Sequence, residues 1–253
     1  MSACVAIGID VGSTTCKLVA VDAAGEILER RVEPTHPRIE QQAERLIAEL
    51  RAKVGGAPPV GATGYGRKRV PQATRSLTEI TCHAKGAFRL ARRGGVLVDM
   101  GGQDTKVVRI GDAGEVRDFS MNDKCAAGTG RFLEVILGRL QVPMIEVGAL
   151  AARAERPIAV SSTCTVFAES EVISLVAQGE PVEGIVKGLH HSLATRVASL
   201  AGALPDGAEI FMSGGVALNA AMVAALEAAL RRKVRVLSEP QLVGALGAAL
   251  SLS

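Results

Sequence analysis

The sequence predicts an α/β protein of two related lobes, because one arrangement of strands and turns occurs twice. Each copy is a three-stranded meander that carries the pattern D-x-G-x-x-x-x-K. The pattern residues are Asp10, Gly12 and Lys17 in the first copy and Asp99, Gly101 and Lys106 in the second. The next turn repeats at the same offset of 89 residues, since Gly25-Glu26 corresponds to Gly114-Glu115. Only two copies occur, which indicates paired lobes and not a solenoid.

Hydrophobic periodicity places helices between and after the two meanders. Apolar residues at helical spacing predict a helix over residues 38–54, which two glycines end. We expect strands at 4–9, 18–22, 27–32, 158–160 and 210–212, further helices at 77–91, 185–204 and about 220–230, and a small-residue helix at 241–252 that packs on the first lobe. The predicted domains are lobe I, residues 1–93 with the C-terminal helix at about 240–253, and lobe II, residues 94–239.

The composition excludes several classes of protein. Hydrophobic residues make up 48% and charged residues 22% of the chain, which is typical of a soluble globular protein. Aromatic residues are only 2% and the net charge is +3, so neither base stacking nor a polyanionic partner is indicated. The N-terminus shows no signal peptide, no apolar run is long enough to span a membrane, and the five cysteines have no paired spacing. We therefore expect a cytoplasmic protein without nucleic-acid or membrane partners.

The two glycine turns are candidate phosphate sites. A tight turn between antiparallel strands directs backbone N–H groups into one pocket, which suits phosphate oxygens. The first turn adds three hydroxyls and a charge, from Ser13, Thr14, Thr15 and Lys17. The matching turn, Gly101-Gly102-Gln103, is expected to face it from the other lobe. The sequence has no G-x-x-x-x-G-K-[ST], which excludes a P-loop.

Two further features support a nucleotide site. Asp10 and Asp99 stand at strand ends beside the glycine turns, where carboxylates would hold Mg²⁺ through water. The pattern S-G-G-V-x-x-N from Ser213 to Asn219 follows a later predicted strand. One D-x-G-x-x-x-x-K pattern is weak evidence, but two at equal spacing together with this loop predict a site for a nucleotide and Mg²⁺.

Two cysteines begin similar stretches, MNDKCAAGTGRFLE with Cys125 and SSTCTVFAESEVI with Cys164. Cys125 comes directly ahead of a Gly-Thr-Gly turn and a predicted helix start, and the second stretch repeats this design with Cys164. Backbone N–H groups and the helix dipole at these places favour the thiolate, the form that ligates metal. An iron–sulfur cluster usually takes four cysteines, which two identical chains would supply across a two-fold axis. The alternative is a pair of buried structural thiols. His83, His190 and His191 are interpreted as helix-surface or packing residues and not as ligands, because no acid or cysteine stands at metal spacing from them.

The quoted turns and the Gly214-Gly215 loop resemble the actin, sugar-kinase and heat-shock ATPase superfamily. Within it, GIDVGSTTCK, ATGYGR, VDMGGQDTK, NDKCAAGTGRF, SSTCTVFAESE and SGGVALN resemble the ATP-dependent activators of 2-hydroxyacyl-CoA dehydratases and the related ATPase subunits of benzoyl-CoA reductases, the BadF/BadG/BcrA/BcrD type. The resemblance covers nearly the whole chain. It implies a two-lobed, actin-like (ribonuclease H-like) fold with duplicated mixed-sheet lobes.

The resemblance also implies a function and a set of site residues. The expected protein is a homodimer with an ATP site in each chain and one [4Fe-4S] cluster held by Cys125 and Cys164 of both subunits. ATP hydrolysis would drive one-electron transfer, from a donor such as ferredoxin or flavodoxin, to an iron–sulfur dehydratase or reductase component. Catalytic roles are expected for Asp10, Asp99, Gln103 and Asp104, although Asp104 alternatively only caps its turn. Nucleotide contacts are expected from Gly12, Ser13, Thr14, Thr15, Cys16, Lys17, Gly101, Gly102, Gln103, Gly214, Gly215, Asn219 and Gln241.

Several alternatives stay open on the sequence. Cys16 stands at a phosphate-turn position where a cysteine is uncommon, and it is a candidate oxidation site. A small-molecule kinase of the same superfamily would share the ATP site but hold no iron. A filament or chaperone module would also lack iron. Within the favoured interpretation, the sequence leaves open a separate activator or a permanent reductase component.

Overall fold

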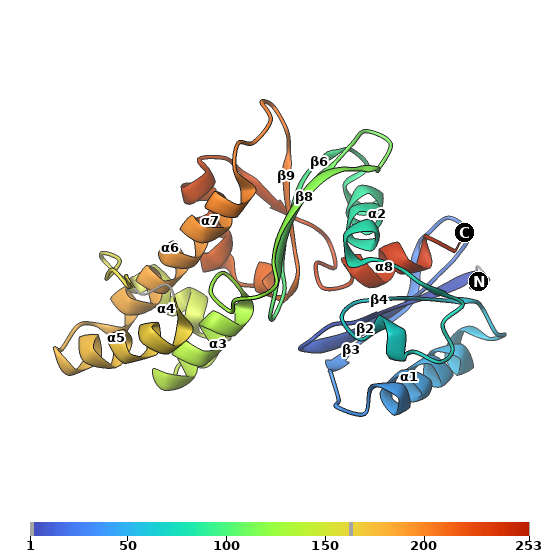
Figure 1. The fold of residues 1–253 in the computed structure, drawn as a ribbon, viewed down its shortest axis with the longest axis horizontal. Helices are drawn as coiled ribbons and strands as arrows, with labels where there is room; N and C mark the ends of the chain where they lie inside the picture. Colours follow the sequence, from blue (N-terminus) through green and yellow to red (C-terminus); the bar gives the residue numbers. More distant parts are fainter. Residues whose placement is uncertain (1–2, 162–163, 253) are drawn as a thin grey trace. The chain divides into compact units, whose positions relative to one another are not determined.

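The computed structural model describes residues 3–161 and 164–252, and Figure 1 shows the fold. The chain forms two units. Unit 1 comprises Met1–Leu97, Val108–Phe119 and Leu237–Ser253, and unit 2 comprises Val98–Val107 and Ser120–Val236. Each sheet of the described chain has five strands, and the predicted α/β class is confirmed.

The first sheet lies in unit 1 and has the strand order β3-β2-β1-β4-β5. Its strands are β1 Ala6–Val11, β2 Thr15–Val21, β3 Ile27–Pro34, β4 Val60–Thr63 and β5 Arg75–Ser76. The first three strands form the predicted antiparallel meander. β4 pairs with β1 in parallel, and β5 pairs with β4 in parallel. The sheet is therefore mixed, with β1 at its centre and buried along its whole length.

Alternation along β1 directs its side chains to two different cores. Ile7 and Ile9 pack with the apolar face of helix α1, Ile39–Val54. Ala6, on the opposite face, packs with residues of helix α8, Val243–Ala249. Figure 1 shows these two helices on opposite sides of the sheet. Burial on both faces explains why β1 is a continuous apolar run and not an alternating one.

Helix α2, Glu79–Ala91, packs against α8 at very short range. A Cβ on Gly86 of α2 would lie 2.0 Å from the carbonyl oxygen of Val243. A Cβ on Gly247 of α8 would lie 1.7 Å from the carbonyl oxygen of Cys82. Neither position has space for a larger residue, so the small residues of both helices set the distance between them.

The second sheet has the strand order β10-β9-β6-β7-β8. Its strands are β6 Gly95–Met100, β7 Thr105–Ile110, β8 Val116–Asn122, β9 Ile210–Ser213 and β10 Val234–Val236. Matching β6 to β1, β7 to β2 and β8 to β3 brings β9 to the place of β4 and β10 to that of β5. The two sheets therefore have the same strand order, and the predicted repeat of three strands is part of it.

Backbone hydrogen bonds repeat together with the strands. Gly25 N–H donates to Asp22 C=O at 2.9 Å, and Gly114 N–H donates to Gly111 C=O at 3.0 Å. Both glycines have a left-handed backbone, with φ of 74° at Gly25 and 82° at Gly114. A glycine adopts this conformation without the steric cost that other residues meet. The repeated Gly-Glu pairs of the sequence thus mark equivalent turns.

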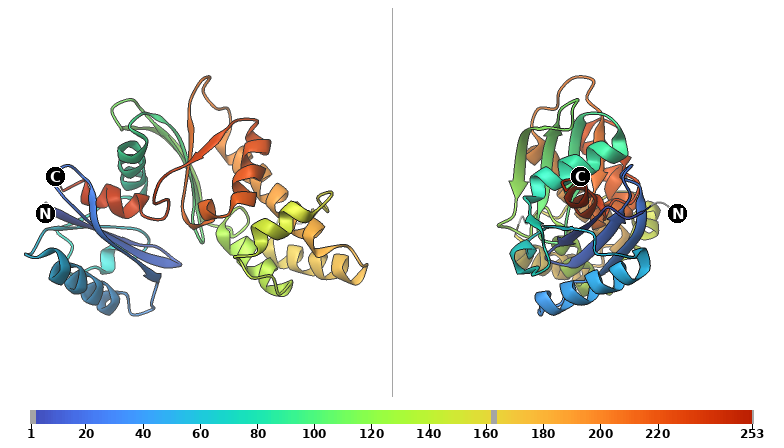
Figure 2. Two further views of the ribbon diagram at one scale, coloured as in Figure 1. Left: turned by 180° about the vertical axis from the view of Figure 1, so that it is seen from behind. Right: turned by 90° about the vertical axis from the view of Figure 1, so that its right-hand side faces the viewer.

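The helices of unit 2 gather in one region of that unit, coloured green to orange in Figures 1 and 2. They are α3 Gly130–Arg139, α4 Val147–Arg153, α5 Thr165–Ala177, α6 Val182–Ala201 and α7 Ala220–Leu230. The short 3-10 turns are η1 Arg67–Arg69 in unit 1 and η2 Gly215–Leu218 in unit 2. Among the described residues, no helix combines the length and the apolar character needed to cross a membrane.

The expected strand at 158–160 is wrong, because this segment pairs with helix α6. Ile158 N–H donates to Gly184 C=O at 2.8 Å. A Cβ on Gly188 would lie 1.7 Å from the carbonyl oxygen of Ile158, so the segment runs directly over two glycines of the helix. Helix α6 itself spans Val182–Ala201, about one turn earlier than expected, and Gly202 follows its end.

The glycine contacts between α2 and α8 predict opposite effects for two helical glycine substitutions. Gly86→Ala should lower the free energy of unfolding by at least about 2 kcal/mol, because the new methyl group meets backbone atoms. Gly138→Ala in α3 is the control, since no atom lies within 4 Å of a Cβ at that position. It should raise the free energy of unfolding by about 0.5–1 kcal/mol through lower chain entropy. Urea unfolding measures both, and equal effects would contradict the packing described.

Candidate functional site

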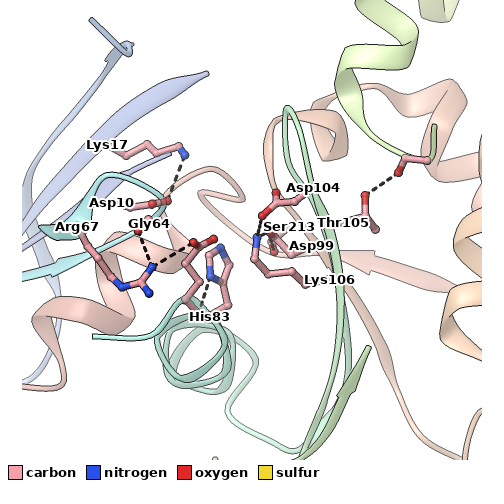
Figure 3. Close-up of polar contacts among 12 residues, drawn as sticks. Asp10, Lys17, Gly64, Arg67, His83, Asp99, Asp104, Thr105, Lys106 and Ser213 are labelled. Carbon is pink, nitrogen blue, oxygen red and sulfur yellow. Dashed lines mark hydrogen bonds and ion pairs between the residues drawn. The ribbon is translucent and has the colours of Figure 1, made fainter. Parts of the chain in front are cut away.

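The first glycine turn joins β1 to β2 and places Asp10 beside Lys17. Gly12 N–H donates to Thr15 C=O at 3.1 Å, which closes the turn. Lys17 Nζ lies 3.1 Å from Asp10 Oδ2, as Figure 3 shows. Asp10 is only 4% exposed, and a buried carboxylate of this kind needs a charged or hydrogen-bonding partner. The turn thus holds a lysine and a carboxylate in fixed positions next to its backbone N–H groups.

The other side chains of the first turn differ in exposure. Ser13 and Thr14 are exposed, and Thr15 is half-buried. Cys16 is buried in the core that α1 covers. Burial, with a smaller contribution from Asp10, raises the pKa of the Cys16 thiol to about 12. Its sulfur is therefore placed neither for contact with a phosphate nor for ready oxidation, which corrects the expectation of an oxidation site.

The second glycine turn has the same backbone and a different charge arrangement. Gly101 N–H donates to Asp104 C=O at 2.9 Å, the counterpart of the Gly12 bond. Lys106 Nζ lies 2.5 Å from Asp104 Oδ2 and 3.5 Å from Asp99 Oδ2 (Figure 3). Ser213 Oγ donates to Asp99 Oδ1 at 2.6 Å. Two carboxylates of this turn thus neutralise Lys106.

The second turn is also hydrogen-bonded to the start of helix α3. Gly130 N–H donates to Gly101 C=O at 2.9 Å, and Arg131 N–H donates to Gly102 C=O at 2.7 Å. Thr105 Oγ1, fully buried, donates to Gly128 C=O at 2.7 Å (Figure 3). The first N–H groups of a helix have no partner within the helix, and here the turn supplies carbonyls for them. Gln103, by contrast, is exposed at the tip of the turn.

The third predicted loop follows β9. Gly214 has φ of 87°, and a Cβ there would lie 2.2 Å from the carbonyl oxygen of Met100, so only glycine fits. Gly215 begins the 3-10 turn η2. Asn219 is the N-cap of α7, where its Oδ1 accepts from the N–H groups of the first turn. Gln241 lies in the turn ahead of α8 in unit 1 and is half-exposed.

The Asn219 amide also fixes the buried residue His190. Because Asn219 Oδ1 accepts from backbone N–H groups, its Nδ2 donates to His190 Nε2 at 2.9 Å. His190 Nδ1 then carries the proton and donates to Val186 C=O at 2.7 Å. Burial lowers the pKa of His190, which agrees with a neutral ring. The Asn219 side chain therefore supports the loop, a role that the sequence pattern did not separate from nucleotide contact.

Cys125 and Cys164 are both exposed, so the alternative of two buried thiols is wrong. Cys164 is the N-cap of α5, as expected. Cys125 lies five positions before the first residue of α3, in a loop held by Asn122 Nδ2, which donates to the Cys125 and Ala127 carbonyls. A turn thus lies between Cys125 and the helix, as the sequence predicts, and the helix begins at Gly130. Residues 162 and 163 of the second stretch lie outside the described residues.

The surroundings of Cys125 include a cation. Arg196 of α6 stands over the Phe132 ring of α3, with its guanidinium carbon 5.4 Å from the ring centre. Burial lowers the pKa of Arg196, and Cys125 opposes this shift electrostatically, which places the two within electrostatic range.

The donor set fits half of a four-thiolate cluster. Within residues 3–161 and 164–252, no three His, Cys, Asp or Glu side chains gather to hold a metal ion. The chain instead presents two exposed thiols in unit 2, on segments whose helices α3 and α5 pack together. Two thiols are half of the four cysteine ligands that an iron–sulfur cluster usually takes.

The comparison with known families identifies the class. The BadF/BadG/BcrA/BcrD ATPase family matches residues 7–251, and the chain belongs to this family. The chain is 41% identical over 251 residues to the activator of lactoyl-CoA dehydratase from Anaerotignum propionicum, covering 96% of this chain and 95% of that one. It is 39% identical over 253 residues to the 2-hydroxyisocaproyl-CoA dehydratase activator of Clostridioides difficile, covering 96% and 93%. A benzoyl-CoA reductase component of Thauera aromatica is 31% identical over 258 residues, covering 96% and 91%.

Solved structures agree with this assignment. Component A of the Acidaminococcus fermentans (R)-2-hydroxyglutaryl-CoA dehydratase has a TM-score of 0.90 at 39% identity, covering 99% of this chain and 97% of that one. The Clostridium difficile 2-hydroxyisocaproyl-CoA dehydratase activator with bound ADPNP has a TM-score of 0.88 at 37% identity, covering 97% and 93%. A glucokinase from Streptomyces griseus, with a TM-score of 0.61 at 17% identity over 97% and 98%, shares the fold alone. The predicted actin-like class with sugar-kinase relatives is confirmed.

The buried His190 predicts a contribution to acid sensitivity. Its folded-state pKa is lowered, so the unfolded chain takes up a proton first as the pH falls below about 6.5. This contribution destabilises the fold at low pH. His190→Gln keeps an oxygen that can accept from Asn219 and removes the titration. Its free energy of unfolding should therefore fall less than that of the parent chain between about pH 7.5 and about pH 5.5, measured by urea unfolding. An equal fall of the free energy of unfolding in the variant and the parent would contradict a lowered pKa of His190.

Proposed function

We propose that this protein is an ATP-hydrolysing electron-transfer protein that activates a 2-hydroxyacyl-CoA dehydratase. The observation that carries the proposal is the pair of exposed thiols, Cys125 and Cys164, in a member of this ATPase family. Two copies of the chain would hold one [4Fe-4S] cluster through these four thiolates. The cluster supplies one-electron chemistry at low potential. A ferredoxin or flavodoxin would deliver the electron, and the iron–sulfur component of the dehydratase would accept it.

The nucleotide would be bound through the two glycine turns and the Gly214 loop. Exposed hydroxyls of Ser13 and Thr14, with the backbone N–H groups of the first turn, suit phosphate oxygens. Lys17 adds positive charge, and Asp10 would hold Mg²⁺ through water. In the second turn, Gln103 is exposed and would face the γ-phosphate, whereas Asp99 and Asp104 balance Lys106. Gly215, Asn219 and Gln241 are proposed to lie along the nucleotide.

Helix α5 supports a pairing of two chains near the thiols. Two large apolar side chains closely follow Cys164 and are exposed, Val166 by 67% and Phe167 by 68%. Exposed apolar groups of this size commonly mark an interaction surface. A second copy bringing its own Cys125 and Cys164 would cover them and complete the metal centre. The bond between the second turn and α3 would then connect ATP hydrolysis to the Cys125 segment.

The iron content tests the proposed function. Anaerobically purified protein should contain about four irons per dimer and show the absorption of a cluster. Cys125→Ser and Cys164→Ser should each remove most of the iron, because each removes two of the four ligands. Cys4→Ser is the matched control, since Cys4 lies in unit 1 and should leave the iron content unchanged.

A colourless protein after anaerobic reconstitution would overturn the electron-transfer proposal. A kinase of the same fold would then be favoured, and it would consume ATP only with a hydroxyl acceptor. If the protein purifies as a dimer without other components, it is favoured as a separate activator and not as a permanent component of a reductase.

The ATP site is tested by the exposed hydroxyls. The double variant Ser13→Ala, Thr14→Val should weaken Mg–ATP binding by about a hundredfold, because two hydrogen bonds to a charged group are lost at about 1.5 kcal/mol or more each, while the backbone donors remain. Its folding stability should change little, since both side chains are exposed. Ser199→Ala on α6 is the control with unchanged affinity. Calorimetric titration with ATP and Mg²⁺ measures the effect, and unchanged affinity in the double variant would contradict the phosphate role.

A further inference from the structure

The carboxylate of Asp10 is enclosed by backbone on both sides. A Cβ on Gly64 would lie 2.4 Å from Asp10 Oδ1, and a Cβ on Gly244 would lie 3.0 Å from Asp10 Oδ2. Gly64 follows β4, and Gly244 belongs to α8, so two separate elements of unit 1 approach the same carboxylate. Glycine at both positions leaves the space that the carboxylate and its partners occupy.

His83 of α2 borders the same space. A Cβ on Gly244 would lie 3.1 Å from His83 Nε2 and 2.8 Å from its Cε1. His83 Nε2 and Asp10 Oδ2 therefore lie no more than about 6.1 Å apart, since both are close to the position of a Gly244 Cβ. One bridging water molecule spans about 4.5–5.5 Å with two hydrogen bonds, a separation that this upper limit includes. Figure 3 shows the imidazole of His83 and the Asp10 carboxylate in the same part of unit 1.

A hydrogen bond of Nδ1 fixes the orientation of the His83 ring. His83 Nδ1 lies 2.9 Å from the carbonyl oxygen of Glu79, one helical turn earlier. A carbonyl oxygen only accepts, so Nδ1 carries a hydrogen and donates it. His83 is 6% exposed, and the start of α2 is held by Thr78, whose Oγ1 accepts from Thr81 N–H. Nε2 is thus the ring nitrogen that borders the space beside Gly244.

Charged groups surround this pair from each neighbouring element. Lys17 of β2 bonds Asp10 Oδ2. Arg67 Nη1, at η1, donates to Gly64 C=O at 3.0 Å and lies 3.7 Å from Glu79 Oε1 (Figure 3). His83 therefore lies in a polar cluster around Asp10, and the interpretation of it as a packing residue does not account for these neighbours. His190 makes the same bond to the carbonyl four residues earlier, but its Nε2 is directed to a helix cap.

We propose that His83 is a positioning residue for ATP hydrolysis and acts through Asp10. Its Nε2 holds, directly or through one water molecule, the Asp10 carboxylate in the orientation in which Asp10 binds the hydration shell of Mg²⁺. The proposal rests on the proposed ATPase function. It adds a residue of α2 to the proposed ATP site, which the sequence indicated only through the glycine turns. Partners that orient a metal-binding carboxylate typically contribute about 10–100-fold to metal affinity or activity.

Two amide substitutions separate the two nitrogens of His83. His83→Gln places a polar amide near the position of Nε2, whereas His83→Asn keeps an N–H near Nδ1 for Glu79 and loses the group that faces Asp10. His83→Gln should hydrolyse ATP within about threefold of the parent rate. His83→Asn should lower kcat about tenfold and raise by about fivefold or more the Mg²⁺ concentration that gives half-maximal rate. The dissociation constant for ATP without Mg²⁺ should not change.

A second variant tests the space itself. Gly244→Ala places a methyl group between His83 and Asp10, so it should reproduce the kinetic loss of His83→Asn while both nitrogens remain. His191→Asn, an exposed histidine of α6, is the control and should keep parent kinetics. Thermal unfolding of each variant confirms that it is folded.

The outcomes separate the inference from the function on which it rests. A parent protein without ATPase activity would overturn both. A parent protein that hydrolyses ATP, with His83→Asn showing parent kcat and parent Mg²⁺ dependence, would overturn the inference alone. Equal losses in His83→Gln and His83→Asn with lowered melting temperatures would assign His83 a purely structural role and would also overturn it.

Discussion

The hydrogen bonds between the second glycine turn and the start of α3 are the constraint on which the site of unit 2 depends. Gly101 and Gly102 give their carbonyls to the first N–H groups of α3, and Thr105 binds the carbonyl of Gly128. A helix start needs such partners, and a tight turn has carbonyls to offer. One set of bonds therefore fixes both the turn proposed for phosphate and the loop that carries Cys125. If either segment moves, the other must move with it or these hydrogen bonds must break.

The two copies of the meander show how one backbone serves two charge arrangements. Gly12 and Gly101 close their turns with the same bond, so duplication preserved the geometry. The residue at the carbonyl end of that bond is Thr15 in the first copy and Asp104 in the second. The additional carboxylate neutralises Lys106, which is almost completely buried. A buried lysine without such a partner would strongly destabilise the fold. The first copy keeps a partly exposed lysine and exposed hydroxyls, features that suit a ligand.

In unit 1, several glycines allow the backbones of neighbouring elements to come very close. Helices α2 and α8 meet through Gly86 and Gly247, and α8 also reaches Asp10 through Gly244. Because the helices lie at this distance, a histidine on α2 and a carboxylate on β1 border one small space. The proposed site of unit 1 therefore depends on glycines whose importance is steric and not conformational.

The sequence by itself determined the duplicated meanders, most helices, the family resemblance and the two thiols, because periodicity, turn glycines and residue spacing are local properties of the chain. It did not determine that 158–160 runs over α6 or that Cys16 points into the core. It also gave no sign of the Ser213 bond to Asp99 or of the space that His83 shares with Asp10. These features join residues distant in the chain, and only the packing of helices on strands brings their atoms together.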